Sequence, residues 1–100
     1  MFTVIYKFKL KPDKIQQFEE NWAELTKLIA KHQGGLGSRL HKNDTLNYIA
    51  YAQWPDRETW ESEWKAMPEH SKEISRKMKE ACLKSETAYE LDVVVDLLKK

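Results

Sequence analysis

The sequence predicts one α+β domain spanning residues 1–100, with a four-stranded antiparallel sheet and helices on one face of that sheet. Three observations lead to this fold class: residues alternate between apolar and polar near both ends of the chain, two internal segments have helical spacing, and a strand changes into a helix at Pro55. A chain of 100 residues has little room for a second hydrophobic core.

The first third of the chain predicts a strand followed by a helix. Residues 2–10 alternate, and one face carries Phe2, Val4, Tyr6, Phe8 and Leu10. A turn at Lys11-Pro12-Asp13 leads to apolar residues at steps of three and four, which are Ile15, Phe18, Trp22, Leu25 and Ile29. Gln33-Gly34-Gly35 ends this helix, because glycine adopts the left-handed conformation without steric penalty.

The middle of the chain predicts a hairpin that leads into a second helical region. Residues 36–41 and 46–54 form its strands, joined by a turn at residues 42–45. Pro55 cannot donate to a sheet, so the strand ends near Trp54, and Asp56 can cap the following helix. Pro68 predicts two helical pieces hinged near residues 66–69. The alternation of residues 87–97 predicts the last strand.

This order of elements is the ferredoxin-like βαββαβ arrangement. The strand at residues 46–54 carries Tyr48 and Trp54 on one side, and Ile49 and Tyr51 on the other. Helices on a single face cannot bury both sides. The sequence therefore predicts a homodimer in which the second face meets another copy of the chain.

Composition narrows the range of functions. The 17 Lys and Arg and 16 Asp and Glu residues are interspersed, which argues against a nucleic-acid partner. The first residues show neither a basic leader nor a long apolar run, so we expect no signal peptide, no membrane partner and a cytoplasmic protein. The lone Cys82, spaced helically from Ile74 and Met78, is interpreted as a buried small hydrophobe, with a reactive thiol as the alternative.

Several of these residues resemble the antibiotic biosynthesis monooxygenase domain family. The resemblance rests on the order of elements, on Tyr51-Ala52-Gln53-Trp54 before a helix containing Glu58 and Trp60, and on His70 after Pro68. It implies a dimeric α+β barrel with a pocket between sheet and helices in each subunit. It also implies oxygenation of phenolic polyketides without metal or flavin, quinol oxidation, or, in one branch, haem degradation.

The resemblance also suggests roles for individual residues. Trp54 occupies the position of a tryptophan in the oxygenases, Trp60 a position that is often aromatic, and His70 that of a family histidine. Ala50 stands where polyketide oxygenases have a strand asparagine. Compared with the haem-degrading branch, Tyr6 replaces an asparagine, and Trp64 and His70 are displaced along the chain.

From these residues we expect Trp54 and His70 to be catalytic, and Tyr6, Ala50, Tyr51, Trp60 and Trp64 to bind a small aromatic substrate. The indole N–H of Trp54 can donate to a developing oxyanion, with Gln53 or Tyr51 as a second donor, and His70 can accept a proton near pH 7. Alternation, however, places Gln53 and Tyr51 on the face opposite Trp54.

Each candidate also has a structural interpretation. Trp54 can be a core residue that fills the space left by Ala50 and Ala52, and Tyr6 can be a core tyrosine. His32, His41 and His70 lack the spacing of a zinc site, so we expect neither a metal nor another cofactor. Two functions remain: a cofactor-independent monooxygenase of quinols or polycyclic phenols, and a non-catalytic dimer that binds an aromatic metabolite or haem.

Overall fold

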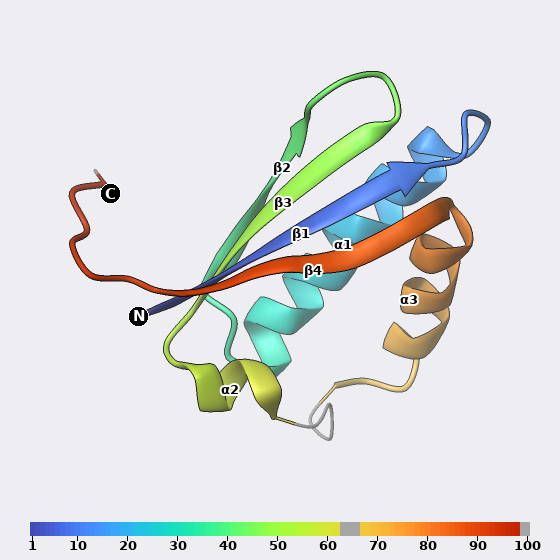
Figure 1. Ribbon diagram of the computed structural model, residues 1–100. Helices are drawn as coiled ribbons and strands as arrows, with labels where there is room; N and C mark the ends of the chain where they lie inside the picture. The colour runs from blue at the N-terminus through green and yellow to red at the C-terminus, as the bar shows by residue number, and fades with distance from the viewer. Residues whose placement is uncertain (63–66, 99–100) are drawn as a thin grey trace.

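The computed structural model describes residues 1–62 and 67–98. Its elements, in chain order, are β1 (Phe2–Leu10), α1 (Ile15–His32), β2 (Gly37–Lys42), β3 (Asn47–Trp54), α2 (Arg57–Glu61), α3 (Ser71–Glu80) and β4 (Cys82–Asp92). The strands form one antiparallel sheet in the order β2-β3-β1-β4, and α1 and α3 cover one of its faces (Figure 1). The predicted ferredoxin-like fold is therefore confirmed.

Three of the residues predicted to begin or end a helix or strand do so in the structure. The first helix ends at the glycines, where Gly34 has φ 84° and Gln33 N–H donates to the Ile29 carbonyl. β3 ends at Trp54, directly before Pro55. Asp56 caps α2, since its carboxylate accepts from the backbone N–H of Thr59 at 2.7 Å.

The second helical region forms two pieces, as Pro68 predicted. α2 ends at Glu61, and α3 begins at Ser71, three residues after the proline. Residues 63–66 lie outside the described part of the chain, so the expectation for Trp64 falls outside the structure as well.

The last strand differs most from its prediction, because β4 begins at Cys82 and ends at Asp92, whereas alternation suggested residues 87–97. β4 pairs along the whole of β1, from Leu10 opposite Cys82 to Phe2 opposite Asp92. Beyond Asp92, β1 has no further strand residue with which to pair. The apolar residues Val94, Val95, Leu97 and Leu98 are therefore exposed, on a segment that leaves the sheet (Figure 1).

The placement of Cys82 on a helical stripe is also wrong. α3 ends at Glu80, and Cys82 is the first residue of β4 and is half-buried. The helical spacing from Met78 ends at Ala81, because the backbone N–H of Lys11 donates to the Ala81 carbonyl and draws the following residues into the sheet.

A β-bulge at Ala88 changes which side chains of β4 face the helices. Ile5 pairs with Tyr89 but Tyr6 pairs with Thr87, so Ala88 has no partner in β1. Thr87 and Glu90 consequently share the helix-facing side with their partners Tyr6 and Val4, and Tyr89 turns to the far face. Strict alternation would have put Thr87 and Tyr89 on the same side.

The core lies between the sheet and the helices in two clusters. One cluster is centred on Phe8, Phe18 and Tyr48, with the rings of Phe8 and Phe18 4.9 Å apart. The other consists of Phe2, Val4, Ala52 and Trp54, near the end of the sheet from which α2 departs. The four even-numbered residues of β3 are buried and the odd ones half-buried, which confirms the two apolar sides predicted for this strand.

Candidate functional site

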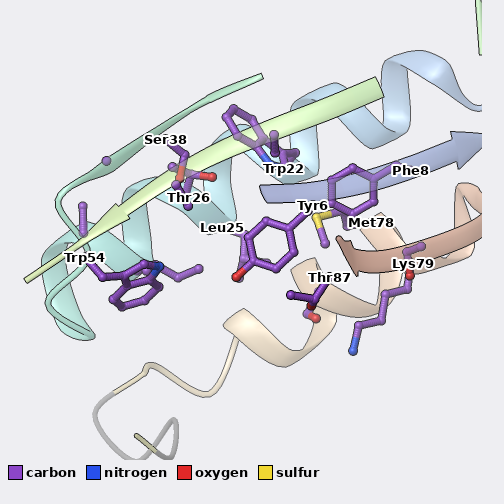
Figure 2. Close-up of a pocket in the computed structure, with 18 of the residues that line it drawn as sticks. Tyr6, Phe8, Trp22, Leu25, Thr26, Ser38, Trp54, Met78, Lys79 and Thr87 are labelled. Atoms are coloured by element: carbon purple, nitrogen blue, oxygen red, sulfur yellow. The ribbon is translucent and has the colours of Figure 1, made fainter. Parts of the chain in front are cut away.

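An apolar cavity of about 360 Å³ lies between the helix-facing side of the sheet, α1 and α3 (Figure 2). Aromatic, aliphatic and small side chains make up most of its wall. From the sheet these include Tyr6, Phe8, Ala50, Ala52, Trp54 and Thr87, and from the helices Trp22, Leu25, Ile29, Ser75 and Met78. A cavity of this size and character is typical of a site for a small organic molecule.

Small residues of β3 create room for the cavity. Ala50 and Ala52 are almost completely buried and line it, next to the large indole of Trp54 on the same stripe. Ala50 is also the register partner of Tyr6 on β1, so a small side chain stands beside the tyrosine ring. The structure thus places the predicted site residues Tyr6, Ala50 and Trp54 in one cavity.

Trp54 carries an unpaired donor. Its side chain is only 5% exposed, and its Nε1 is the buried side-chain polar atom that finds no hydrogen-bond partner within the described residues. Most buried N–H groups in proteins are paired, because leaving one unpaired costs free energy. An unpaired indole N–H in the wall of an apolar cavity points to a ligand that provides the acceptor.

Tyr6 and Trp60 form a hydrogen bond that sequence analysis did not anticipate. The Nε1 of Trp60 donates to the hydroxyl of Tyr6 at 2.8 Å, across 54 positions of sequence. Trp60 is half-buried, packs its ring on Phe2 with centroids 5.6 Å apart, and stands behind Tyr6, outside the cavity wall. Tyr6 thus lines the cavity directly, and Trp60 influences it through Tyr6.

The surroundings of Tyr6 keep its hydroxyl protonated. Burial raises the pKa of Tyr6, and the negative charge of Glu90 raises it further, whereas the hydrogen bond from Trp60 lowers it; the net pKa lies above the usual value. Tyr6 is therefore a neutral hydrogen-bond donor at physiological pH.

Arg57 anchors α2 where Trp60 can reach Tyr6. Its guanidinium lies over the ring of Phe2, 4.6 Å from the centroid, and donates to Glu90 Oε1 at 2.5 Å and to Glu61 Oε1 at 3.3 Å. This places the first turn of α2 against the ends of β1 and β4. Glu90 can bond to Arg57 because the bulge at Ala88 turns its side chain to the side of the sheet that faces the helices.

His70 is not positioned as expected. It is exposed and occupies the N-cap of α3, and it does not line the cavity. The expectation of an interior ring followed the helical spacing through Pro68, but α3 starts only at Ser71, so that spacing does not continue across the proline.

Tyr51, which was expected to bind substrate, does not line the cavity, whereas Gln53 borders it. Their side chains occupy the opposite side of β3, as alternation indicated, and Gln53 Nε2 donates to the Tyr51 hydroxyl at 3.0 Å. Tyr6 is a further hydrogen-bond donor among the residues that line the cavity.

Sequence reasoning also missed several cavity residues. Cys82 lines the cavity from β4, where burial raises its thiol pKa and the thiol lies 3.5 Å from the Met78 carbonyl oxygen. Thr26 and Ser38 add hydroxyl groups from α1 and β2. The helical spacing of Leu25 and Ile29 could have located the α1 wall, but nothing local to β4 indicated which of its residues would face the helices.

Two further findings concern cofactors and membranes. Within residues 1–62 and 67–98, no three His, Cys, Asp or Glu side chains gather in a way that could hold a metal ion. In the same part of the chain, no helix combines the length and the apolar character needed to cross a bilayer.

Comparison with known families identifies the family of this chain. The family model described as antibiotic biosynthesis monooxygenase matches residues 1–76. The chain belongs to this family. The matched residues include β1, β3 and α2, and with them Tyr6, Trp54 and Trp60. A search of curated proteins found no match.

Solved structures share the fold of this antibiotic biosynthesis monooxygenase domain at low sequence identity. A structure described as a putative antibiotic biosynthesis monooxygenase from Bordetella bronchiseptica has a TM-score of 0.76 at 15% identity, covering 94% of this chain and 97% of its own. SnoaB, a cofactor-independent oxygenase from Streptomyces nogalater, has a TM-score of 0.75 at 16% identity, covering 98% and 97%. An antibiotic biosynthesis monooxygenase has a TM-score of 0.74 at 19% identity, covering 95% and 100%.

Proposed function

We propose that this monooxygenase-family domain is a cofactor-independent monooxygenase of a quinol or polycyclic phenol. The observation that carries the proposal is the unpaired, buried N–H of Trp54 in the wall of an apolar cavity. Membership of the family and the fold shared with SnoaB, which is described as a cofactor-independent oxygenase, support the same reaction class.

In this reaction the substrate itself supplies the electrons. A phenol or anthrone that loses a proton becomes an electron-rich enolate, which transfers an electron to O₂. The substrate radical and superoxide then combine to form a carbon–oxygen bond, and the peroxide anion takes up a proton to become a hydroperoxide, which loses water and leaves a carbonyl group. One oxygen atom enters the product and the other leaves as water. Trp54 stabilises the oxyanion by donating its N–H, and the apolar wall excludes solvent from the reacting centre.

The experiment is oxygen uptake with a panel of anthrones, naphthols and quinols, using chelator-treated protein without added metal or flavin. Trp54→Phe keeps an aromatic ring and removes the donor. Loss of one preorganised oxyanion donor typically lowers the rate roughly a hundredfold. The matched control is Tyr48→Phe, which removes a tyrosine hydroxyl that donates to Glu19 and does not line the cavity.

Two outcomes would contradict the oxygenase proposal. One is no uptake above a denatured control with any member of the panel, and the other is normal turnover by Trp54→Phe. Either result would favour a non-catalytic module that binds an aromatic metabolite or haem. The exposed position of His70 is the observation that keeps this second function open, since no histidine lines the cavity within the described residues.

We also propose that the chain is a cytoplasmic homodimer whose two sheets meet through their far faces. The far face carries the half-buried Tyr51 and the exposed Tyr89 and Leu91, which are 56% and 45% exposed. A second copy of the same chain would cover this apolar surface.

A further inference from the structure

The cavity opens between α3 and β4. Ser85 and Thr87 are the register partners of Phe8 and Tyr6, so their side chains are on the side of the sheet that faces the helices. Phe8 is buried, whereas Ser85 and Thr87 are exposed although they line the same cavity. Helix α3 therefore leaves this part of β4 uncovered, and a ligand can reach the cavity here.

The rim of this opening is polar, unlike most of the cavity wall. Ser75 and Lys79 are four residues apart on α3, so they project from the same face of the helix. With Ser85 and Thr87 of β4 they give the rim three hydroxyl groups and one ammonium group. Figure 2 shows Lys79 and Thr87 at the end of the cavity away from Trp54. In the part of the chain that the structure describes, these four rim side chains have no hydrogen-bond or ion-pair partner.

Lys79 keeps its positive charge available at the rim. The carboxylates of its own helix are those of Glu73 and Glu80, and both accept from Arg76, at 2.6 and 2.8 Å. Glu80 also pairs with Lys14 at 3.6 Å. These carboxylates are therefore engaged by other cations and do not occupy the amine of Lys79.

The glutamates of β4 do not neutralise this charge either. Glu86 borders the cavity, but its register partner is Lys7, whose amine lies over the ring of Tyr89 on the far face. Alternation therefore turns the Glu86 carboxylate to the far face. Glu90 faces the helices and is engaged by Arg57. The rim thus presents a positive charge and hydroxyl donors to a molecule that enters the cavity.

We propose that the cavity takes an aromatic carboxylic acid, with its ring system against α1 and β3 and its carboxylate at Lys79. The wall from α1 and β3 includes apolar side chains such as Trp22, Leu25 and Ala50, which suit a ring but cannot stabilise a charge. An ammonium group and hydroxyl groups form charge-assisted hydrogen bonds with a carboxylate. Lys79 is therefore a specificity-determining residue. The proposal rests on the cavity of the proposed function and deepens it by adding an acidic group to the substrate, but it requires no reaction with O₂.

The test compares the binding of two probes of the same shape that carry no phenol. Anthracene-2-carboxylic acid is an anion at neutral pH, and anthracene-2-carboxamide is its uncharged analogue. Both are fluorescent, so their dissociation constants can be measured by titration. At low ionic strength the wild-type protein should bind the acid about fivefold to tenfold more tightly than the amide, because an ion pair and hydroxyl donors act on the anion. This preference should fall as salt is added.

A charge-removing variant and a matched control assign the preference to Lys79. Lys79→Met removes the charge and keeps most of the length of the side chain. It should abolish the preference for the acid and leave the affinity for the amide unchanged. Lys77→Met removes the same charge from the same helix at a residue that does not line the cavity, so it should keep the preference.

Two further variants test the geometry of the rim. Thr87→Val replaces the hydroxyl by a methyl group and should lower the preference for the acid about threefold. Lys79→Glu should reverse the preference, so that the cation anthracen-2-ylmethylamine binds more tightly than the acid. Thermal melting of each variant establishes that it is folded, and the exposed position of Lys79 makes its variants the decisive ones.

The outcomes separate this inference from the oxygenase proposal. Equal affinity of the wild type for the acid and the amide overturns the inference, as does failure of both probes to bind or an unchanged preference in Lys79→Met. A preference that depends on Lys79, without oxygen uptake by any member of the phenol panel, supports the carboxylate site and contradicts the oxygenase. Oxygen uptake without a preference for the acid contradicts the carboxylate site and leaves the oxygenase.

Discussion

The unpaired N–H of Trp54 should lower the free energy of unfolding of the ligand-free protein. The substitution Trp54→Phe measures the size of this effect. The substitution shortens a buried ring and deletes the donor at the same time. If the cavity is built for a ligand, the ligand-free protein bears the cost of an unsatisfied group, which the variant no longer has.

The two effects of Trp54→Phe are of similar size and opposite sign. The side chain is 95% buried by area, and replacing an indole by a phenyl ring loses about 1–2 kcal/mol of apolar burial. Removing a buried donor without a partner returns about 1–3 kcal/mol. We therefore expect the free energy of unfolding of Trp54→Phe to lie within about 1 kcal/mol of the wild-type value.

A control removes buried ring surface without removing a polar group. Phe18→Leu does this in the other core cluster, at a fully buried position, and should lose about 1–2 kcal/mol. Urea unfolding should be followed by circular dichroism, because tryptophan fluorescence changes with the substitution itself. A single protein concentration keeps any effect of dimer formation constant.

A loss of more than about 2 kcal/mol in Trp54→Phe would refute this reasoning. It would mean that the indole N–H makes a favourable hydrogen bond in solution, for example to an ordered water in the cavity. In that case the donor would be satisfied in the ligand-free protein, and a ligand would have to displace that partner.

Two further predictions concern the rest of the fold. The Tyr48 hydroxyl donates to Glu19 Oε2 at 2.6 Å, and this bond, with burial, raises the pKa of Tyr48 to about 12. The stabilisation from this hydrogen bond is present below the ordinary pKa of 10.0 and is lost as pH rises toward 12. The difference in unfolding free energy between wild type and Tyr48→Phe should therefore shrink over that range. A difference that does not change with pH would contradict this prediction. In sedimentation at micromolar concentration, we expect the mass of two chains, and Leu91→Arg should give that of one. A wild-type mass of one chain at all concentrations would rule out the proposed dimer.

Part of the site could be read from the sequence because it depends on neighbours along the chain. Alternation placed Ala50, Ala52 and Trp54 on one stripe of β3, and the structure confirms that these residues share the cavity wall. Alternation also placed Tyr51 and Gln53 on the other side. The end of the strand at Pro55 and the cap at Asp56 follow from backbone chemistry within a few residues.

What only the tertiary structure decided depends on residues far apart in the sequence. β4 begins at Cys82 because β1 offers a partner there, and the bulge at Ala88 selects the side chains that face the helices. The hydrogen bond between Tyr6 and Trp60 needs Arg57 to hold α2 against the end of the sheet. Periodicity reports the face of a single strand or helix, but which faces meet is set by strand pairing and packing between distant segments. The sequence by itself therefore determined the order of elements and the position of Trp54, and the tertiary structure decided that Tyr6 lines the same cavity and accepts a hydrogen bond from Trp60.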